Sequence, residues 1–123
     1  MKEHLSGRAS PTERTLAWLR ARGYSPEKVE QRVNFGKTTR DFMGFADILA
    51  IRLGDKDGVL AVQATTVDHI KDRVAKIKAE PRARLWRQCG NSIWVVGWAK
   101  VAPETGRRKV YKAVIAQIGD NGA

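Results

Sequence analysis

Cysteine is nearly absent from this sequence of 123 residues, because Cys89 is the only one. A single cysteine excludes an internal disulfide and a cysteine-based zinc site, and we expect Cys89 to be a small buried apolar residue. There is no glycine-rich phosphate loop, so we expect no small-molecule cofactor. The sequence has no apolar run near the ~20 residues of a membrane span, and its start lacks the apolar segment of a secretory signal. We therefore expect a soluble, cytoplasmic protein with no membrane partner.

Acidic residues are scarce relative to basic ones, with 13 Asp and Glu against 23 Lys and Arg, a net charge of +10. This balance favours a polyanionic partner, and nucleic acid leads over a membrane surface or an acidic protein. The acids concentrate in residues 41–70, which hold five acidic and two basic residues. Basic segments lie on both sides, at 13–40 and 71–87. Flanking cations could hold a phosphate backbone while central carboxylates hold a metal, although Asp55 and Asp57 are also typical turn residues.

The length and composition predict one domain over residues 10–118, between a flexible N-terminal segment at 1–9 and a flexible tail at 119–123. Ser10 and Glu13 form a capping box that predicts the start of a helix, and Gly23 ends it. Hydrophobic spacing and turn residues predict strands at 28–34, 44–53, 58–65, 92–99 and 109–118, a basic helix from 66 to 80, a short helix at 83–88, and turns at 54–58 and 103–106. We expect Trp94 and Trp98 to share one strand face and pack in the core.

This order of elements resembles the PD-(D/E)XK nuclease superfamily over about residues 10–100. Asp47, in the run GFADIL, matches the family's aspartate, and Gln63-Ala64-Thr65 occupies the position of its (D/E)-X-K tripeptide. The resemblance implies an α/β, restriction-endonuclease-like αβββαβ core, with a central mixed sheet flanked by helices and one extra C-terminal strand. More narrowly, GFADILAIR, AVQATT and VVGWAK resemble small phage-type nuclease-like proteins with a Q-x-T form of the motif. This implies a phage or prophage origin.

The resemblance also implies a site for Mg²⁺ or Mn²⁺. Asp47 would be a carboxylate ligand, while the Gln63 side chain and the Ala64 backbone carbonyl would be neutral oxygen ligands. Gln63 replaces a carboxylate, and the candidates for the missing acid are Glu13, Asp41 and, third, Glu30. Thr65 replaces the catalytic lysine, and the basic helix offers Lys71, Arg73 and Lys76 in its place. The alternative for these cations is a solvated or DNA-facing surface.

Basic residues on and around that helix are the expected DNA contacts, namely Arg40, Lys71, Arg73, Lys76, Lys78, Arg82 and Arg84. The leading hypothesis is a metal-dependent DNA endonuclease or nuclease-like DNA-binding protein, structure-selective for branched or junction DNA. Small stand-alone members of the superfamily include Holliday-junction resolvases, so the resemblance implies a homodimer. The alternatives are a catalytically decayed fold that binds nucleic acid without cutting it, and a phage-type protein-interaction module.

Overall fold

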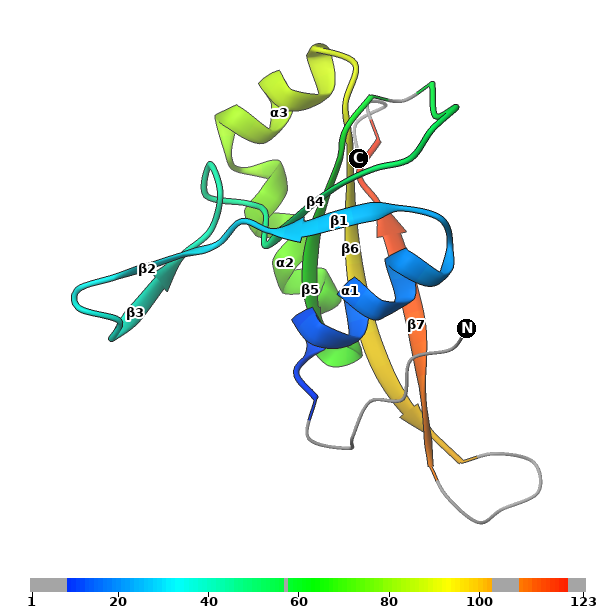
Figure 1. The fold of residues 1–123 in the computed structure, drawn as a ribbon. Helices are drawn as coiled ribbons and strands as arrows, with labels where there is room; N and C mark the ends of the chain where they lie inside the picture. The colour runs from blue at the N-terminus through cyan, green and yellow to red at the C-terminus, as the bar shows by residue number, and fades with distance from the viewer. Residues whose placement is uncertain (1–8, 57, 103–108, 120–123) are drawn as a thin grey trace.

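The computed structural model describes residues 9–56, 58–102 and 109–119. In chain order the elements are α1 (Pro11–Ala21), β1 (Ser25–Lys28), β2 (Gln31–Val33), β3 (Thr38–Arg40), β4 (Ile48–Ile51), β5 (Leu60–Thr66), the 3₁₀ turn η1 (Val67–His69), α2 (Ile70–Lys78), α3 (Pro81–Gln88), β6 (Ser92–Val101) and β7 (Val110–Gln117). Five strands form a mixed sheet in the order β1-β4-β5-β6-β7, in which only β5 and β6 are parallel among the described pairs. The expected α/β class, with helices on a mixed sheet and an added C-terminal strand, is confirmed (Figure 1).

Helix α1 covers one face of the sheet. The Ser10 hydroxyl accepts a hydrogen bond from the Glu13 amide, and the Glu13 carboxylate accepts one from the Ser10 amide, both at 3.1 Å. This confirms the predicted capping box, which satisfies two amides that the helix itself cannot pair. Leu19 is fully buried against the sheet, in a cluster that also includes Val62 of β5 and Trp98 of β6.

Helices α2 and α3 cover the opposite face, where Ile77 and Ala83 pack in a second cluster with Phe45 and Val95 (Figure 1). Alternate residues of β5 therefore enter different clusters, and the prediction that this strand is buried on both faces is confirmed. Gly97 of β6 allows α2 to approach closely, because a Cβ at this position would lie 2.5 Å from Ile70.

The expected single strand at 28–34 is wrong. Its first residue ends β1 in the main sheet, and its later part forms β2, which pairs with β3 in a separate two-stranded hairpin. The hairpin projects from the body of the protein (Figure 1). Alternating polarity fits a half-exposed strand in either sheet, so it could not locate the break between them.

The expected strand at 44–53 is also shorter than predicted, since β4 begins at Ile48. Met43 and Gly44 have φ values of 51° and 80°, which place a turn where the sequence suggested a strand. Glycine suits this position because its φ of 80° is a backbone conformation that residues with a side chain rarely adopt. Asp47 consequently lies just before β4 rather than inside it.

Two further predictions concern side chains. Trp94 and Trp98 do pack against the α1 face, where the Trp98 ring nitrogen donates to the Thr15 hydroxyl at 2.9 Å. Cys89, however, is exposed at the end of α3, so the prediction of a buried cysteine is wrong. Cys89 is the C-cap of α3, so it lies at the end of the helix, beyond the residues that pack into the second cluster.

Some expectations concern residues that the structure does not describe. The predicted turn at 103–106 lies outside the described residues, as do the flexible ends predicted at 1–9 and 119–123 apart from Ala9 and Gly119. Within the described parts of the chain, no helix has both the length and the apolar character needed to cross a membrane.

Candidate functional site

Three carboxylates meet at the edge of the sheet where β4 begins. Ligand oxygens of Glu30, Asp41 and Asp47 all lie within 4.8 Å of one another, and we call these residues the acidic cluster. Each acid lies outside a strand, with Glu30 just before β2, Asp41 just after β3 and Asp47 just before β4. Three segments of backbone therefore supply one carboxylate each.

Backbone hydrogen bonds hold these segments together. The Val29 amide donates to the Asp47 carbonyl at 2.8 Å, which fixes the chain beside Glu30. The Phe42 amide donates to the Ala46 carbonyl at 2.8 Å and closes the turn between the two aspartates. Phe45, at the centre of that turn, is fully buried with its ring 6.0 Å from that of Trp86. A core contact thus anchors the turn, so that the two carboxylates are held side by side.

Asp47 is the most buried acid of the cluster, with 6% of its surface exposed. One carboxylate oxygen accepts a hydrogen bond from the Ala64 amide of β5 at 2.9 Å. Burial raises the Asp47 pKa from 3.8 to about 7, and the adjacent Asp41 carboxyl adds to the rise through a shared hydrogen bond and charge repulsion. A buried carboxyl with a raised pKa favours either a bound proton or a neighbouring cation, so Asp47 is suited to hold one or the other.

Gln63 lies beside Asp47 and is 2% exposed. Its side-chain hydrogen bond to Asp47 lowers the pKa of that acid, opposing the effect of burial. The other half of the amide, Oε1, is buried and has no hydrogen-bond partner among the described residues. An unsatisfied buried acceptor destabilises the folded state by about 1–3 kcal/mol, so a hydrogen-bond donor or a cation beside this oxygen would be stabilising. Acidic oxygens next to an unsatisfied amide oxygen fit the donor set of a hard divalent cation.

The other two residues of the tripeptide differ in what they offer. The Ala64 carbonyl lies on the same edge of β5 as the amide that binds Asp47, because both groups of one strand residue point to the same side. Thr65 is buried on the same face of β5 as Gln63 and lies opposite Gly97 of β6. A threonine hydroxyl at this position supplies no positive charge.

Lysines reach the cluster from two directions. Lys76 of α2 lies 3.9 Å from an Asp41 oxygen, and Lys28 lies 3.1 Å from a Glu30 oxygen. Lys71 precedes Lys76 by five residues, which places it about 140° further round the helix. Of the two candidate lysines, the structure therefore pairs Lys76 with the acidic cluster.

A cavity of about 460 Å³ adjoins the cluster, and Asp41 belongs to both. Its lining includes Arg40 at the end of β3 and Arg82 of α3. Arg82 also binds Glu80 at 2.9 Å, which anchors the guanidinium beside the turn at Gly44. Two arginines facing a cavity next to carboxylates are suited to an anionic group that also contacts a cation. The other expected DNA contacts lie on α2 or α3, with Arg73 half-buried and Lys71, Lys78 and Arg84 exposed.

Glu13, which was as plausible a candidate for the missing acid as Asp41, lies elsewhere. It is on α1, which packs on the other face of the sheet, and its carboxylate is occupied by the capping hydrogen bond to Ser10. That hydrogen bond lowers the Glu13 pKa. The structure brings Asp41 and Glu30 to Asp47 instead.

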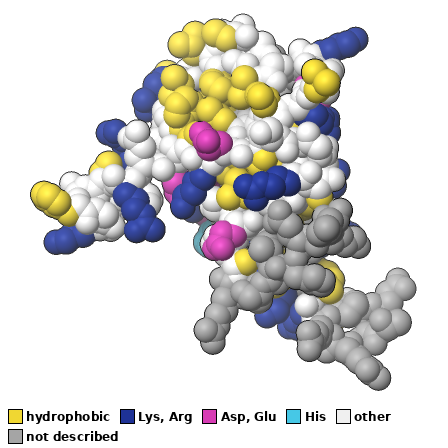
Figure 2. Space-filling model, in the orientation of Figure 1, with side chains coloured by type: hydrophobic (Ala, Val, Ile, Leu, Met, Phe, Trp, Pro, Cys, Tyr) yellow, Lys and Arg dark blue, Asp and Glu magenta, His cyan; other side chains and the backbone are white. Residues whose placement is uncertain are grey.

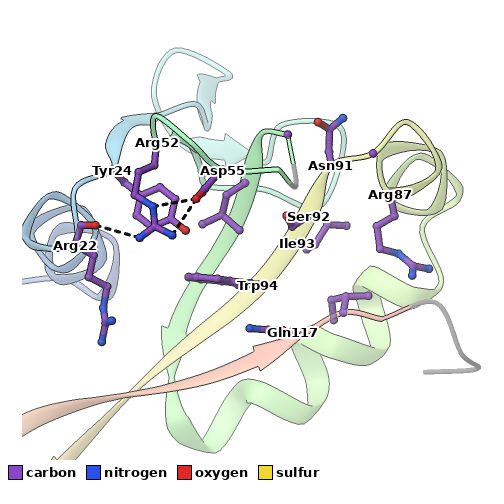
Figure 3. A pocket seen from close by; sticks show the side chains of 14 residues that line it. Arg22, Tyr24, Arg52, Asp55, Arg87, Asn91, Ser92, Ile93, Trp94 and Gln117 are labelled. Atoms are coloured by element: carbon purple, nitrogen blue, oxygen red, sulfur yellow. Dashed lines mark hydrogen bonds and ion pairs between the residues drawn. The ribbon is translucent and has the colours of Figure 1, made fainter.

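A second cavity, of about 490 Å³, opens near the start of β5 and β6, at the other end of the sheet (Figure 3). Tyr24 and Trp94 contribute to its wall. Its acid, Asp55, is bound by Arg52 at 3.0 Å, and Arg52 also donates to the Arg22 carbonyl at 3.1 Å. Asp55 is the one carboxylate among the described residues that line this cavity, so within that part of the chain the clustered acids lie beside Asp47.

Sequence reasoning ranked Glu30 third and missed Lys28. Lys28 and Glu30 are two residues apart and share one face of an extended chain, but alternating polarity does not show that Glu30 meets Asp41 and Asp47. The candidate site therefore rests on its own geometry. No model of a known protein family, no curated protein and no solved structure gives a significant match to this chain.

Proposed function

We propose that this protein is a metal-dependent DNA endonuclease whose site is the acidic cluster. The observation that carries the proposal is the meeting of the Glu30, Asp41 and Asp47 carboxylates beside Gln63, whose buried side chain hydrogen-bonds to Asp47 and whose Oε1 has no partner among the described residues. Mg²⁺ or Mn²⁺ is the cofactor that this oxygen-only set suits, since both ions prefer carboxylate, carbonyl and water ligands. The net charge of +10 supports DNA as the partner.

Each residue has a definable task in this proposal. Asp47, Asp41 and Glu30 would hold the cation, with the Gln63 side chain and the Ala64 carbonyl as neutral ligands. Arg40 and Arg82 bind the phosphate backbone from the adjoining cavity. A divalent ion held there would supply a water nucleophile at neutral pH and would offset charge on the phosphate.

Lys76 takes the place of the lysine that Thr65 cannot supply. Its ammonium lies 3.9 Å from Asp41, close enough to place a positive charge beside the phosphate that the cluster would bind. A cation aimed at charge that develops during the reaction stabilises the transition state more than the bound substrate. Lys76 is therefore the proposed catalytic cation, and Lys71 belongs to the DNA-binding surface.

A second candidate function is DNA binding without cleavage. The ion pairs Lys28–Glu30 and Lys76–Asp41 favour it, because they balance two of the three acids without a metal. In that case Gln63 and Thr65 would be substitutions in a site that has lost its catalytic activity.

Cleavage of labelled linear, flapped and four-way-junction DNA in Mg²⁺, Mn²⁺ or EDTA separates the two functions. We expect cutting in either metal, none in EDTA, and none by Asp47→Asn. Asp68→Asn is the matched control, since Asp68 is exposed and lies outside the acidic cluster. Binding by the unmodified protein with no cutting in any metal would favour the second function, and equal cutting by Asp47→Asn would refute the site.

A further inference from the structure

The β2–β3 hairpin is a projecting arm with almost no contact to the core. Of residues 31–40, Val33 is half-buried and the others are exposed. Three residue pairs, from Gln31–Arg40 to Val33–Thr38, join the two strands. A two-stranded hairpin without a packed face is marginally stable alone, so the arm contributes little to the stability of the fold. This makes a role in binding the better explanation for its length.

A phenylalanine occupies the end of the arm. Phe35 is 106% exposed, so its ring contacts essentially nothing in the protein. In Figure 2 a hydrophobic side chain marks the outer end of the projecting arm, with basic side chains along it. Phe35 also has a φ of 56°, a left-handed conformation that costs energy for a residue with a bulky side chain. Neither packing nor backbone preference explains an aromatic residue at this position.

The charge of the arm indicates its partner. Residues 31–40 contain Arg32, Lys37 and Arg40 and no acid. An aromatic ring presented among cations matches the surface of DNA, where phosphates attract the cations and bases stack on the ring. A purely apolar protein partner would not call for this charge.

The arm also starts and ends at the acidic cluster, because Glu30 precedes β2 and Asp41 follows β3. Phe35 lies five residues beyond Glu30, so at ~3.3 Å per residue its Cα is within ~17 Å of the cluster. This corresponds to about five nucleotide steps at ~3.4 Å each. DNA bound at the cluster would therefore pass within reach of the ring.

We infer that the β2–β3 hairpin is a DNA-probing arm that inserts Phe35 between bases a few nucleotides from the acidic cluster. The inference rests on the proposed function, to which it adds a substrate class. Inserting a ring into a continuous duplex requires unstacking of a base step, which costs a few kcal/mol. At a bulge, nick or branch point the base stacking is already disrupted, so insertion costs less there. The arm therefore selects DNA with a weakened base step.

The test uses aminopurine, whose fluorescence rises when it is unstacked, placed opposite a nick or in a continuous duplex, with EDTA present to prevent cleavage. We expect the full chain to raise the fluorescence in nicked DNA. Phe35→Ala should abolish the rise and weaken binding of nicked DNA by about 5- to 100-fold. Phe35→Trp should retain both. Leu53→Ala is the matched control, because Leu53 is also fully exposed, at 102%, and lies after β4 away from the arm.

An unchanged fluorescence rise in Phe35→Ala, or equal losses in Leu53→Ala, would overturn the inference. Conversion of a dimer to a monomer by Phe35→Ala in sedimentation would also overturn it, because Phe35 would then be a subunit contact. The proposed function fails separately. Phe35-dependent binding without cleavage in Mg²⁺ or Mn²⁺ would support the arm and refute the nuclease. Metal-dependent cutting with no effect of Phe35→Ala would support the nuclease and refute the arm.

Discussion

Replacing Asp47 with asparagine should stabilise the metal-free protein, and the gain should grow with pH. An asparagine side chain resembles the protonated acid, because its oxygen can accept from the Ala64 amide while its NH₂ group donates to Asp41. The unmodified protein must instead ionise a buried carboxyl whose pKa has risen from 3.8 to about 7. This pKa difference corresponds to about 4 kcal/mol in the free energy of unfolding. The contribution stabilises the folded state at acid pH, and it is lost as pH rises through 7.

The change between two convenient pH values follows from the same linkage. Between pH 3.8 and 7 the folded protein holds a proton that the unfolded chain has released, so stability falls as pH rises. From pH 5.5 to 8 the Asp47 contribution falls by about 2 kcal/mol, whereas the asparagine side chain of the variant does not titrate. The difference in free energy of unfolding between Asp47→Asn and the unmodified protein should therefore increase by about 2 kcal/mol. For a domain of this size that is about 6–10 °C in Tm.

Urea unfolding in EDTA at the two pH values measures this difference directly. Asp68→Asn is the control, because the Asp68 pKa lies below its ordinary value and the group stays ionised throughout this range. Its stability difference from the parent should not change with pH. If the difference in free energy of unfolding between Asp47→Asn and the parent stays constant, or becomes smaller at pH 8, the account of Asp47 as a buried acid with a raised pKa is refuted.

Two further predictions concern the metal and the lysine. Mn²⁺ should raise Tm more at pH 8 than at pH 5.5, because the ion binds ionised carboxylates and must displace the Asp47 proton at the lower pH; an equal or larger shift at pH 5.5 would contradict this. Lys76→Met should lower the cleavage rate by about 10²–10³-fold in single-turnover assays, with DNA affinity changed only a few-fold. Lys71→Met, the matched change on the same helix, should leave the cleavage rate nearly intact, and the opposite ranking would reassign the catalytic cation.

Local signals in the sequence predicted much of the fold. Ser10, Pro11 and Glu13 sufficed to place the start of α1, because a capping box needs only neighbouring residues. The apolar run in β5 predicted a central strand for the same kind of reason. Asp47 could be singled out as a candidate site residue because an acid in an apolar segment is costly without a partner.

The predictions that were wrong, for the strands at 28–34 and 44–53, concern features that depend on contacts between distant segments. The break between β1 and β2, and the turn at Gly44 against α3, are set by packing that periodicity does not encode. The acids that join Asp47 could not be ranked for the same reason. Glu13 lies on the other face of the sheet, whereas Asp41 and Glu30 arrive through backbone pairing near Asp47.

The central claim is that the acidic cluster holds a divalent cation, and calorimetric titration of Mn²⁺ at pH 7 tests it most directly. We expect saturable binding that releases about half a proton per ion, seen by comparing buffers of different ionisation enthalpy, because Asp47 is about half protonated at that pH. Asp47→Asn should weaken the binding and abolish the proton release. No binding at millimolar Mn²⁺ with DNA present, or equal binding and proton release by Asp47→Asn, would contradict the account.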